Sequence, residues 1–219
     1  NLLKCIFLVV SYCIYYVFNV ISIPIKQTIK PAVNTHFYNF FGLNETLFIQ
    51  INQLTNKGFL PDILSAISSV FFIANFAACY IAVCIYFYFK SKKATHIEAY
   101  FTPIYNELFR IGTCYALFGF TFAALKFSFN MPRPFCSLAQ GQFTTIANTE
   151  LERCLSSFPS AHTGLSILVT YALWSHLNRS GKLFCCIIVA LVAISRLTLA
   201  MHYPADIIYS ALVTLIIIT

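Results

Sequence analysis

The chain has 219 residues, of which 59% are hydrophobic and only 10% are charged, and its formal net charge is +7. Soluble domains are about 45–50% apolar and about 25% charged, so this composition excludes a water-soluble globule. It indicates one membrane-embedded domain over residues 1–219, built as a helix bundle in lipid. The basic residues are dispersed, with no run of five or six, which argues against a nucleic-acid-binding surface.

Six apolar segments are candidates for membrane-spanning helices, each of which needs about 20 mainly apolar residues. In chain order they are Leu2–Ile23, Ser65–Phe89, Ile111–Phe129, Ser160–Leu177, Leu183–Ala200 and Pro204–Thr219. The last three are short. The first segment lacks an A-x-A-like cleavage site, so it is expected to span the membrane rather than to serve as a signal peptide.

A helix of a different kind is expected between the first two spans. The stretch NETLFIQINQLTNKG begins with Asn44 as a candidate cap, repeats apolar residues at helical spacing and ends at Gly58. This pattern predicts an amphipathic helix at the membrane interface. The predicted fold is therefore all-α and polytopic, with six transmembrane helices and one interfacial helix.

The distribution of basic residues indicates the orientation. Seven lie on one side of the predicted path and seven on the other, but three of the second group belong to the motifs described below. Setting those three aside leaves seven against four, so the positive-inside rule places both termini in the cytoplasm. The larger group comprises Lys4, Lys90, Lys92, Lys93, Arg110, Arg179 and Lys182.

Two of the nine cysteines differ from the others. Seven lie in apolar segments and are expected to act as small hydrophobic residues. Cys136 and Cys154 instead flank a polar loop, with seventeen residues between them. They can form a disulfide if that loop faces an oxidising compartment, and otherwise remain free thiols.

The unusual polar residues fall in two connections that must emerge on the same side, because two spans separate them. The connection between the third and fourth spans opens with KFSFNMPRP and closes with SFPSAHTG, and the connection between the fifth and sixth contains SRLTLAMHYPAD. Charged groups at this depth cost several kcal/mol each, so they indicate a functional site. The candidate residues are Lys126, Arg133, Ser160, His162, Arg196, His202 and Asp206.

Three cations at one site indicate an anionic ligand, and the forked donors of arginine suit phosphate oxygens. Ser160 follows Pro159 and precedes an apolar run, so it is a candidate helix N-cap. The backbone amides of Ala161 and His162 would then point out of a helix N-terminus, which is a ready site for an anion. These features predict a binding site for phosphate or a chemical analogue.

Two histidines and a carboxylate indicate chemistry as well as binding. Asp206 lies four residues after His202, near the start of a helix that Pro204 can initiate. The carboxylate can then bond one imidazole nitrogen and leave the other free to attack phosphorus. His162 is the candidate general acid for the leaving oxygen, and the cations and amides would stabilise the transition state.

These stretches resemble the three signature motifs of the type 2 phosphatidic acid phosphatase superfamily. The first motif, K-x6-RP, is met by Lys126, Arg133 and Pro134. The second, PSGH, is met by Pro159, Ser160 and His162, and the third, SR-x5-H-x3-D, by Ser195, Arg196, His202 and Asp206. One position departs from the pattern, because Ala161 stands where the motif has glycine. It keeps an amide donor, but its methyl group narrows the approach to the anion.

The resemblance implies a role for each matched residue. His202 would be the nucleophile that forms a phosphohistidine, Asp206 would orient it, and His162 would act as acid and then as base. Lys126, Arg133, Ser160, Ala161 and Arg196 would bind the substrate phosphate, with no metal and no cofactor. The implied protein is a lipid phosphatase of the bacterial inner membrane, with its site on the extracytoplasmic face and the bilayer and a membrane lipid phosphate as partners. Family substrates are phosphatidylglycerophosphate, undecaprenyl diphosphate, phosphatidic acid and lipid A phosphates, and the sequence does not choose among them.

Two other functions remain open at this point. A phosphohistidine can pass its phosphoryl group to a second lipid, which would make the protein a phosphotransferase. A transporter or binding protein that recognises phosphate without chemistry would also place charged groups near broken helices. Such a protein has no need of the His202–Asp206 pair, and no inverted repeat is present. A soluble haloperoxidase is disfavoured by the spans.

Overall fold

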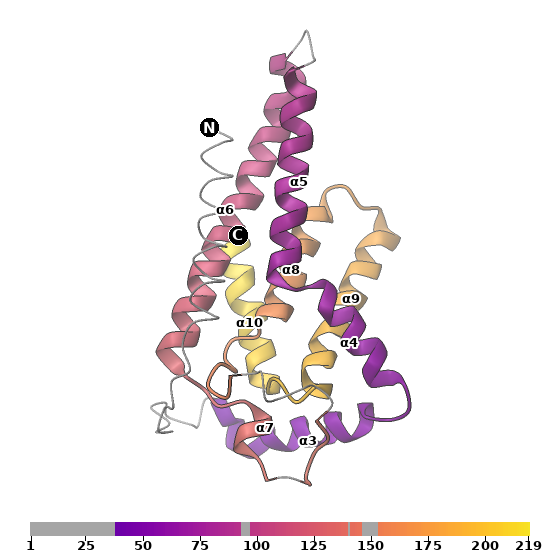
Figure 1. Ribbon diagram of the computed structural model, residues 1–219, viewed down its shortest axis with the longest axis vertical. Helices are drawn as coiled ribbons and strands as arrows, with labels where there is room; N and C mark the ends of the chain where they lie inside the picture. Colours follow the sequence, from indigo (N-terminus) through magenta and orange to yellow (C-terminus); the bar gives the residue numbers. More distant parts are fainter. Residues whose placement is uncertain (1–37, 93–96, 140, 146–152) are drawn as a thin grey trace. The chain divides into compact units, whose positions relative to one another are not determined.

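The computed structural model describes residues 38–92, 97–139, 141–145 and 153–219, and these form helices without any β-strand. The predicted all-α class is therefore confirmed for the described residues, whereas the predicted span Leu2–Ile23 lies outside them. The elements are η1 (Phe40–Gly42), α3 (Leu43–Thr55), α4 (Leu60–Val70), α5 (Ile73–Lys92), α6 (Ile97–Phe129), α7 (Pro134–Ser137), α8 (Ala161–Trp174), α9 (Arg179–Thr198) and α10 (Pro204–Ile218) (Figure 1).

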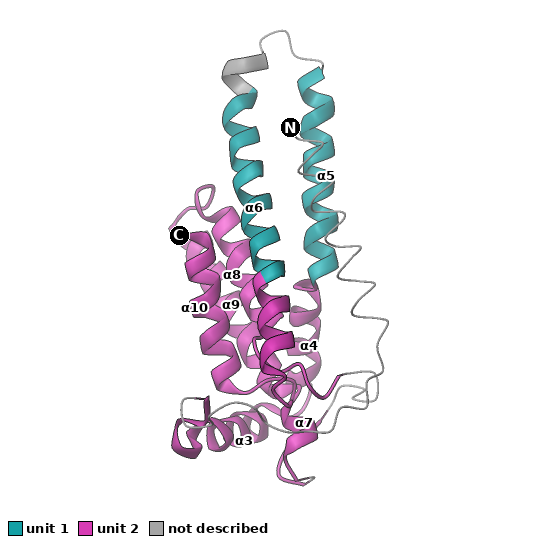
Figure 2. Ribbon diagram, turned by 90° about the vertical axis from the view of Figure 1, so that its left-hand side faces the viewer, with its two compact units in different colours: residues 1–28, 73–120 teal, residues 29–72, 121–219 magenta. Residues whose placement is uncertain are grey.

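The chain divides into two compact units, one of residues 1–28 and 73–120 and one of residues 29–72 and 121–219 (Figure 2). In the first unit, α5 packs against the first part of α6. The hydroxyl of Tyr80 donates to the carbonyl of Leu108 at 2.7 Å. A Cβ atom at Gly112 would lie 2.3 Å from that hydroxyl, so glycine is required for this close approach.

The second unit holds every residue of the predicted site. In it α8 packs against α9 and α10, and α4 packs along α9. Helix α3 lies across the ends of α9 and α10 (Figures 1 and 2). The apolar core at this crossing contains Phe48 from α3, Leu197 from α9, and Ala200 and Tyr203 from the joint between α9 and α10. The core therefore lies directly beside the third sequence motif.

Three described helices are long and apolar enough to cross a membrane: α5, the Phe101–Phe129 part of α6, and α9. They correspond to the second, third and fifth predicted spans. Helices α8 and α10 have 14 and 15 residues, which is shorter than the 20 or so that a span needs. The structure thus supports an integral membrane protein, but it does not confirm six transmembrane helices.

The predicted second span, Ser65–Phe89, is wrong in its bounds because the chain breaks between α4 and α5. At this break the hydroxyl of Ser69 donates to the carbonyl of Ala66 at 2.8 Å. The amide of Phe71 donates three residues back, to Ser68, at 3.0 Å. Serine hydroxyls compete with the backbone for such carbonyls, and an i→i−3 bond tightens the last helical turn. The sequence is apolar on both sides of the break, so hydropathy alone did not indicate where α4 ends.

The starts of two other spans were also predicted too late. Helix α6 begins at Ile97, so Arg110 lies inside it and forms an ion pair with Glu107 at 3.7 Å rather than lying in a connection. Helix α9 begins at Arg179, because the side chain of Asn178 accepts the amide of Gly181 at 2.8 Å. Charged residues in a first turn or at helical spacing are compatible with a continuing helix, so they do not mark its end.

Helix α3 confirms the predicted amphipathic helix but not its cap or its end. Gly42, at φ 92°, occupies the N-cap position, and the helix ends at Thr55 rather than at Gly58. Asn44 is buried, and its side-chain oxygen accepts the amide of Ala205 at 2.9 Å. It therefore satisfies the first turn of α10 instead of its own helix.

Candidate active site

The second motif forms the N-terminus of α8. Ser160 occupies the N-cap position with extended dihedrals, and Ala161 and His162 are the first two residues of the helix. Their amides therefore belong to a helix N-terminus, as predicted. The Ser160 hydroxyl does not cap the helix through its side chain but lies 3.1 Å from the hydroxyl of Thr163. The Ser160 amide donates to the Asp206 backbone carbonyl at 3.4 Å, which joins the second motif to the third.

The third motif is the joint between α9 and α10. After α9 ends, Ala200 adopts φ 55°, and the amides of Met201 and His202 donate to the carbonyl of Arg196 at 3.0 and 3.3 Å. The amide of Ala200 donates to the carbonyl of Leu197 at 3.0 Å. This is a Schellman closure with alanine at the left-handed position that glycine usually occupies. The closure fixes the spacing between the arginine and the histidine.

The start of α10 fixes the second half of the third motif. Pro204 is the first residue of α10, and Asp206 accepts the Tyr203 amide at 2.8 Å in a capping box. His202 Nδ1 lies 3.5 Å from Asp206 Oδ2, and the two side chains are 3% and 0% exposed. The predicted histidine–carboxylate pair is therefore brought together, with Nδ1 facing the carboxylate.

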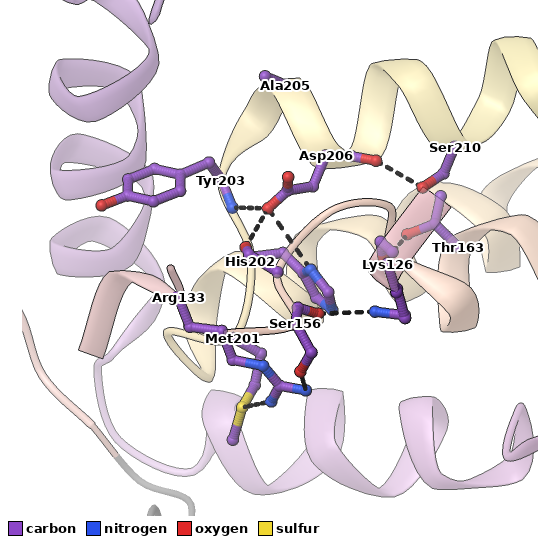
Figure 3. Close-up of polar contacts among 12 residues, drawn as sticks. Lys126, Arg133, Ser156, Thr163, Met201, His202, Tyr203, Ala205, Asp206 and Ser210 are labelled. Atoms are coloured by element: carbon purple, nitrogen blue, oxygen red, sulfur yellow. Dashed lines mark hydrogen bonds and ion pairs between the residues drawn. The ribbon is translucent and has the colours of Figure 1, made fainter. Parts of the chain in front are cut away.

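The three cations of the motifs lie near this pair. Lys126 Nζ donates to the Ser156 carbonyl at 2.6 Å, and Arg133 donates to the Ser156 hydroxyl at 3.1 Å and to the Met201 sulfur at 3.0 Å. Figure 3 shows Lys126, Arg133 and His202 converging around Ser156. Arg196 is buried and donates to the Ser68 hydroxyl at 3.2 Å.

The electrostatic environment links these groups to both imidazoles. The charges of Arg196, Lys126 and Arg133 act on His162 as well as on His202. Burial, followed by the charges of Arg196, Lys126 and Arg133, holds the pKa of His202 well below its usual range. At neutral pH His202 is therefore neutral, and one of its ring nitrogens has a free electron pair.

The two ends of the connection between α6 and α8 are held together beside the site. Cys136 and Cys154 form a disulfide with a Cα–Cα distance of 5.7 Å. The amide of Arg133 donates to the Cys154 carbonyl at 2.8 Å, and the amide of Ser157 donates to the Met131 carbonyl at 3.0 Å. The first and second motifs are thus joined by backbone pairing and by a covalent bond.

Two further residues contact Asp206 that the sequence did not indicate. The Tyr38 hydroxyl donates to Oδ1 at 2.6 Å, and the Ser157 hydroxyl donates to Oδ2. Ser157 lies within the SFPSAHTG stretch, but nothing in its position marked it as a partner of Asp206. Tyr38 is 168 residues from Asp206 along the chain, and no local pattern marked it.

Comparison with known proteins agrees with this geometry. The model of the PAP2 superfamily matches residues 107–219. No curated protein sequence matches the chain. The crystal structure of Aquifex aeolicus LpxE is similar with a TM-score of 0.63 and 18% identity, covering 87% of this chain and 96% of that one.

A second solved structure shows the same fold. It is a transmembrane PAP2-type phosphatidylglycerolphosphate phosphatase from Bacillus subtilis, with a TM-score of 0.57 and 17% identity, covering 96% of this chain and 92% of that one. At these identities the likeness shows the fold, whereas the family model covers more than half of the sequence and all three motifs. The chain therefore belongs to the PAP2 superfamily.

Proposed function

We propose that this enzyme removes phosphate from a membrane lipid phosphate monoester or diphosphate without a metal, through a phosphohistidine on His202. The observation that carries the proposal is the buried His202, on which the charges of Arg196, Lys126 and Arg133 act and whose Nδ1 lies 3.5 Å from Asp206 Oδ2. A neutral imidazole oriented in this way is a nucleophile. The surrounding cations suit the charge of a phosphoryl group.

In the first step Nε2 of His202 attacks phosphorus, and the bond from phosphorus to the leaving oxygen breaks. Asp206 stabilises the positive charge that develops on the imidazole. The bound phosphate is an anion and favours the protonated form of His162, so His162 takes up a proton with the substrate. It then donates this proton to the leaving oxygen, which departs as the lipid alcohol or lipid phosphate. The phosphoryl oxygens would be held by the α8 N-terminus and by the side chains of Lys126, Arg133 and Arg196.

In the second step water attacks phosphorus of the phosphohistidine. His162, now neutral, accepts a proton from that water, and the bond between phosphorus and Nε2 breaks. Inorganic phosphate leaves, and His202 and His162 return to their starting protonation states. Each step passes one proton through His162, so the cycle balances.

Phosphatidylglycerophosphate, undecaprenyl diphosphate, phosphatidic acid and lipid A phosphate are the candidate substrates. We place the site at the extracytoplasmic face of a bacterial inner membrane, where the motifs and the Cys136–Cys154 loop lie on one side of the predicted path. The disulfide supports this assignment, because disulfides persist in oxidising compartments. The methyl group of Ala161 at the α8 N-terminus would restrict the approach of bulky head groups.

The test is phosphate release from these four lipids by purified protein in detergent with EDTA, for the wild type and for two variants. We expect release from at least one lipid and loss of more than about 95% of the rate in His202→Ala, since removing a nucleophile costs several orders of magnitude. His176→Ala is the matched control, because His176 is exposed and belongs to no motif. A phosphate-labelled protein that survives alkali and is lost in acid would identify phosphohistidine.

Other outcomes would contradict particular parts of the proposal. Activity that EDTA abolishes and Mg²⁺ restores would contradict the metal-free mechanism. Release that persists in His202→Ala would remove His202 as the nucleophile. Label that moves from a donor lipid to an added acceptor lipid would indicate a phosphotransferase, and saturable phosphate binding with no turnover would indicate a non-catalytic protein.

A further inference from the structure

The carboxylate of Asp206 has more hydrogen-bond donors than a partner for one imidazole requires. Tyr38 donates to Oδ1 at 2.6 Å, while the Ser157 hydroxyl and the Tyr203 amide, the latter at 2.8 Å, donate to Oδ2. His202 Nδ1 approaches the same Oδ2 at 3.5 Å. Asp206 and Ser157 are both completely buried. The two hydroxyls thus reach the carboxylate from two distant parts of the chain.

We infer that Tyr38 and Ser157 are positioning residues for catalysis. They hold the Asp206 carboxylate in the orientation, and in the ionised form, that the His202 nucleophile requires. This inference rests on the proposed function. Tyr38 fixes Oδ1 and so directs Oδ2 toward the imidazole. Hydrogen bonds donated to a carboxylate favour its ionised form, so the two hydroxyls oppose transfer of the imidazole proton to Asp206.

The contacts separate this role from the capping of α10. The Tyr203 amide satisfies the helix start through Oδ2, and Ser210 bonds the backbone carbonyl of Asp206 rather than its carboxylate. The start of α10 is therefore satisfied at Asp206 by the Tyr203 amide and by Ser210, without Tyr38 or Ser157. The hydroxyls of Tyr38 and Ser157 bond no backbone group at the start of α10, so in this region they act on the Asp206 carboxylate.

The ring of Tyr38 has a separate packing role that a phenylalanine would preserve. It meets Phe158 and Tyr203 edge-on, with ring centroids 6.2 and 6.3 Å apart. Replacing Tyr38 with phenylalanine therefore removes the donor and keeps both ring contacts. This makes Tyr38→Phe a clean probe of the hydroxyl.

The first experiment measures kcat and KM for Tyr38→Phe and Ser157→Ala on the lipid that the wild type hydrolyses. We expect kcat to fall about 10- to 100-fold in each, the worth of a hydrogen bond to a charged group, with KM within about twofold. Ser210→Ala is the matched control for the serine. Tyr203→Phe is the control for the tyrosine, because its hydroxyl contacts Ser137 rather than Asp206. Ser157→Thr, which keeps a hydroxyl, should recover most of the lost rate.

The second experiment asks whether Tyr38 acts through Asp206. In an Asp206→Asn background, Tyr38→Phe should lower kcat by less than about twofold, because the charge that it stabilises is already gone. Equal losses in the two backgrounds would overturn the inference, as would a kcat for Tyr38→Phe equal to that of the wild type. Thermal unfolding of each variant in detergent checks that the compared proteins are folded.

A third measurement does not depend on turnover. In protein labelled with 15N-histidine, His202 of the wild type should give the signals of the tautomer protonated at Nδ1, and Tyr38→Phe should give a mixture of tautomers. An unchanged tautomer in the variant would overturn the inference even if the protein hydrolyses no lipid on the panel. If the wild type hydrolyses no lipid but the His202 tautomer still changes in Tyr38→Phe, only the proposed function is contradicted.

Discussion

At the scale of single residues, burial of a histidine among three cations has a consequence for folding as well as for reactivity. His202 is neutral in the folded protein because burial, with Arg196, Lys126 and Arg133 nearby, lowers its pKa, while Asp206 faces its other side. In the unfolded chain the same side chain takes up a proton below its ordinary pKa of about 6.5. The stability that neutral burial supplies is therefore fully present above pH 6.5 and is lost as the pH falls below it.

We predict that acid destabilises the wild type more steeply than a variant without this imidazole. The free energy of unfolding should fall by up to about 1.4 kcal/mol per pH unit below about pH 6.5 on account of His202. Thermal unfolding in detergent at pH 7.5, 6.5 and 5.5 should give a smaller decrease in Tm for His202→Gln. A variant that loses as much Tm as the wild type over this range would show that His202 is not held neutral.

The sequence could predict which motif residues come together at the candidate site because each motif is local. Arg196, His202 and Asp206 lie within eleven residues, and their spacing follows from one helix end and one helix start. Tyr38 could not be predicted in this way, because its contact with Asp206 depends on how distant segments pack. Ser157 lies beside a motif, but an isolated serine has no spacing that distinguishes a donor from a turn residue.

At the scale of elements, α3 forms hydrogen bonds to both helix ends that carry the third motif, the end of α9 and the start of α10. The Asn52 amide donates to the carbonyls of Leu197 and Thr198 at 3.1 and 2.9 Å and to that of Thr144 at 3.1 Å. Its oxygen accepts the Thr144 amide at 2.9 Å. Asn44, eight residues earlier on the same face, bonds the first turn of α10. The interfacial helix predicted from amphipathicity therefore also fixes the joint between α9 and α10.

We predict that Asn52→Leu destabilises the protein by about 1–3 kcal/mol, because the carbonyls of Leu197 and Thr198 lose a buried hydrogen-bond donor. Gln53→Leu is the matched control, since Gln53 makes an exposed bond to the Gln142 carbonyl at 3.0 Å. Thermal unfolding in detergent should show a lower Tm for Asn52→Leu alone. A Tm equal to that of the control would mean that the hydrogen bonds of Asn52 contribute little to stability.

The asparagines of α3 also show where pattern analysis is limited. Asn44 was predicted to be a cap because it precedes an apolar run, yet the structure places it on the buried face, where it bonds a different helix. An asparagine at a helix start and an asparagine that bridges two helices look alike in one sequence. Only the packing of α3 on α9 and α10 distinguishes them.

At the scale of the whole molecule, composition was sufficient for the all-α class and for a membrane location. It was not sufficient for the bounds of the spans. The break between α4 and α5 coincides with one serine side-chain bond and one backbone bond, each reaching three residues back. The start of α9 depends on one side-chain cap at Asn178. Such features involve single atoms, whereas hydropathy averages over about twenty residues. Segment-wide properties were therefore predicted well and helix ends poorly.

The disulfide at the edge of the site determines what limited proteolysis would do. A single cut at any peptide bond between Cys136 and Cys154 leaves the two fragments joined through sulfur, with backbone pairing between residues 131–133 and 154–157 beside it. The nicked enzyme would migrate as one band without reductant and as two bands with it. The fragment that contains Lys126 and Arg133 and the fragment that contains His162 and His202 would therefore stay covalently joined, so we expect the nicked enzyme to keep its activity until it is reduced.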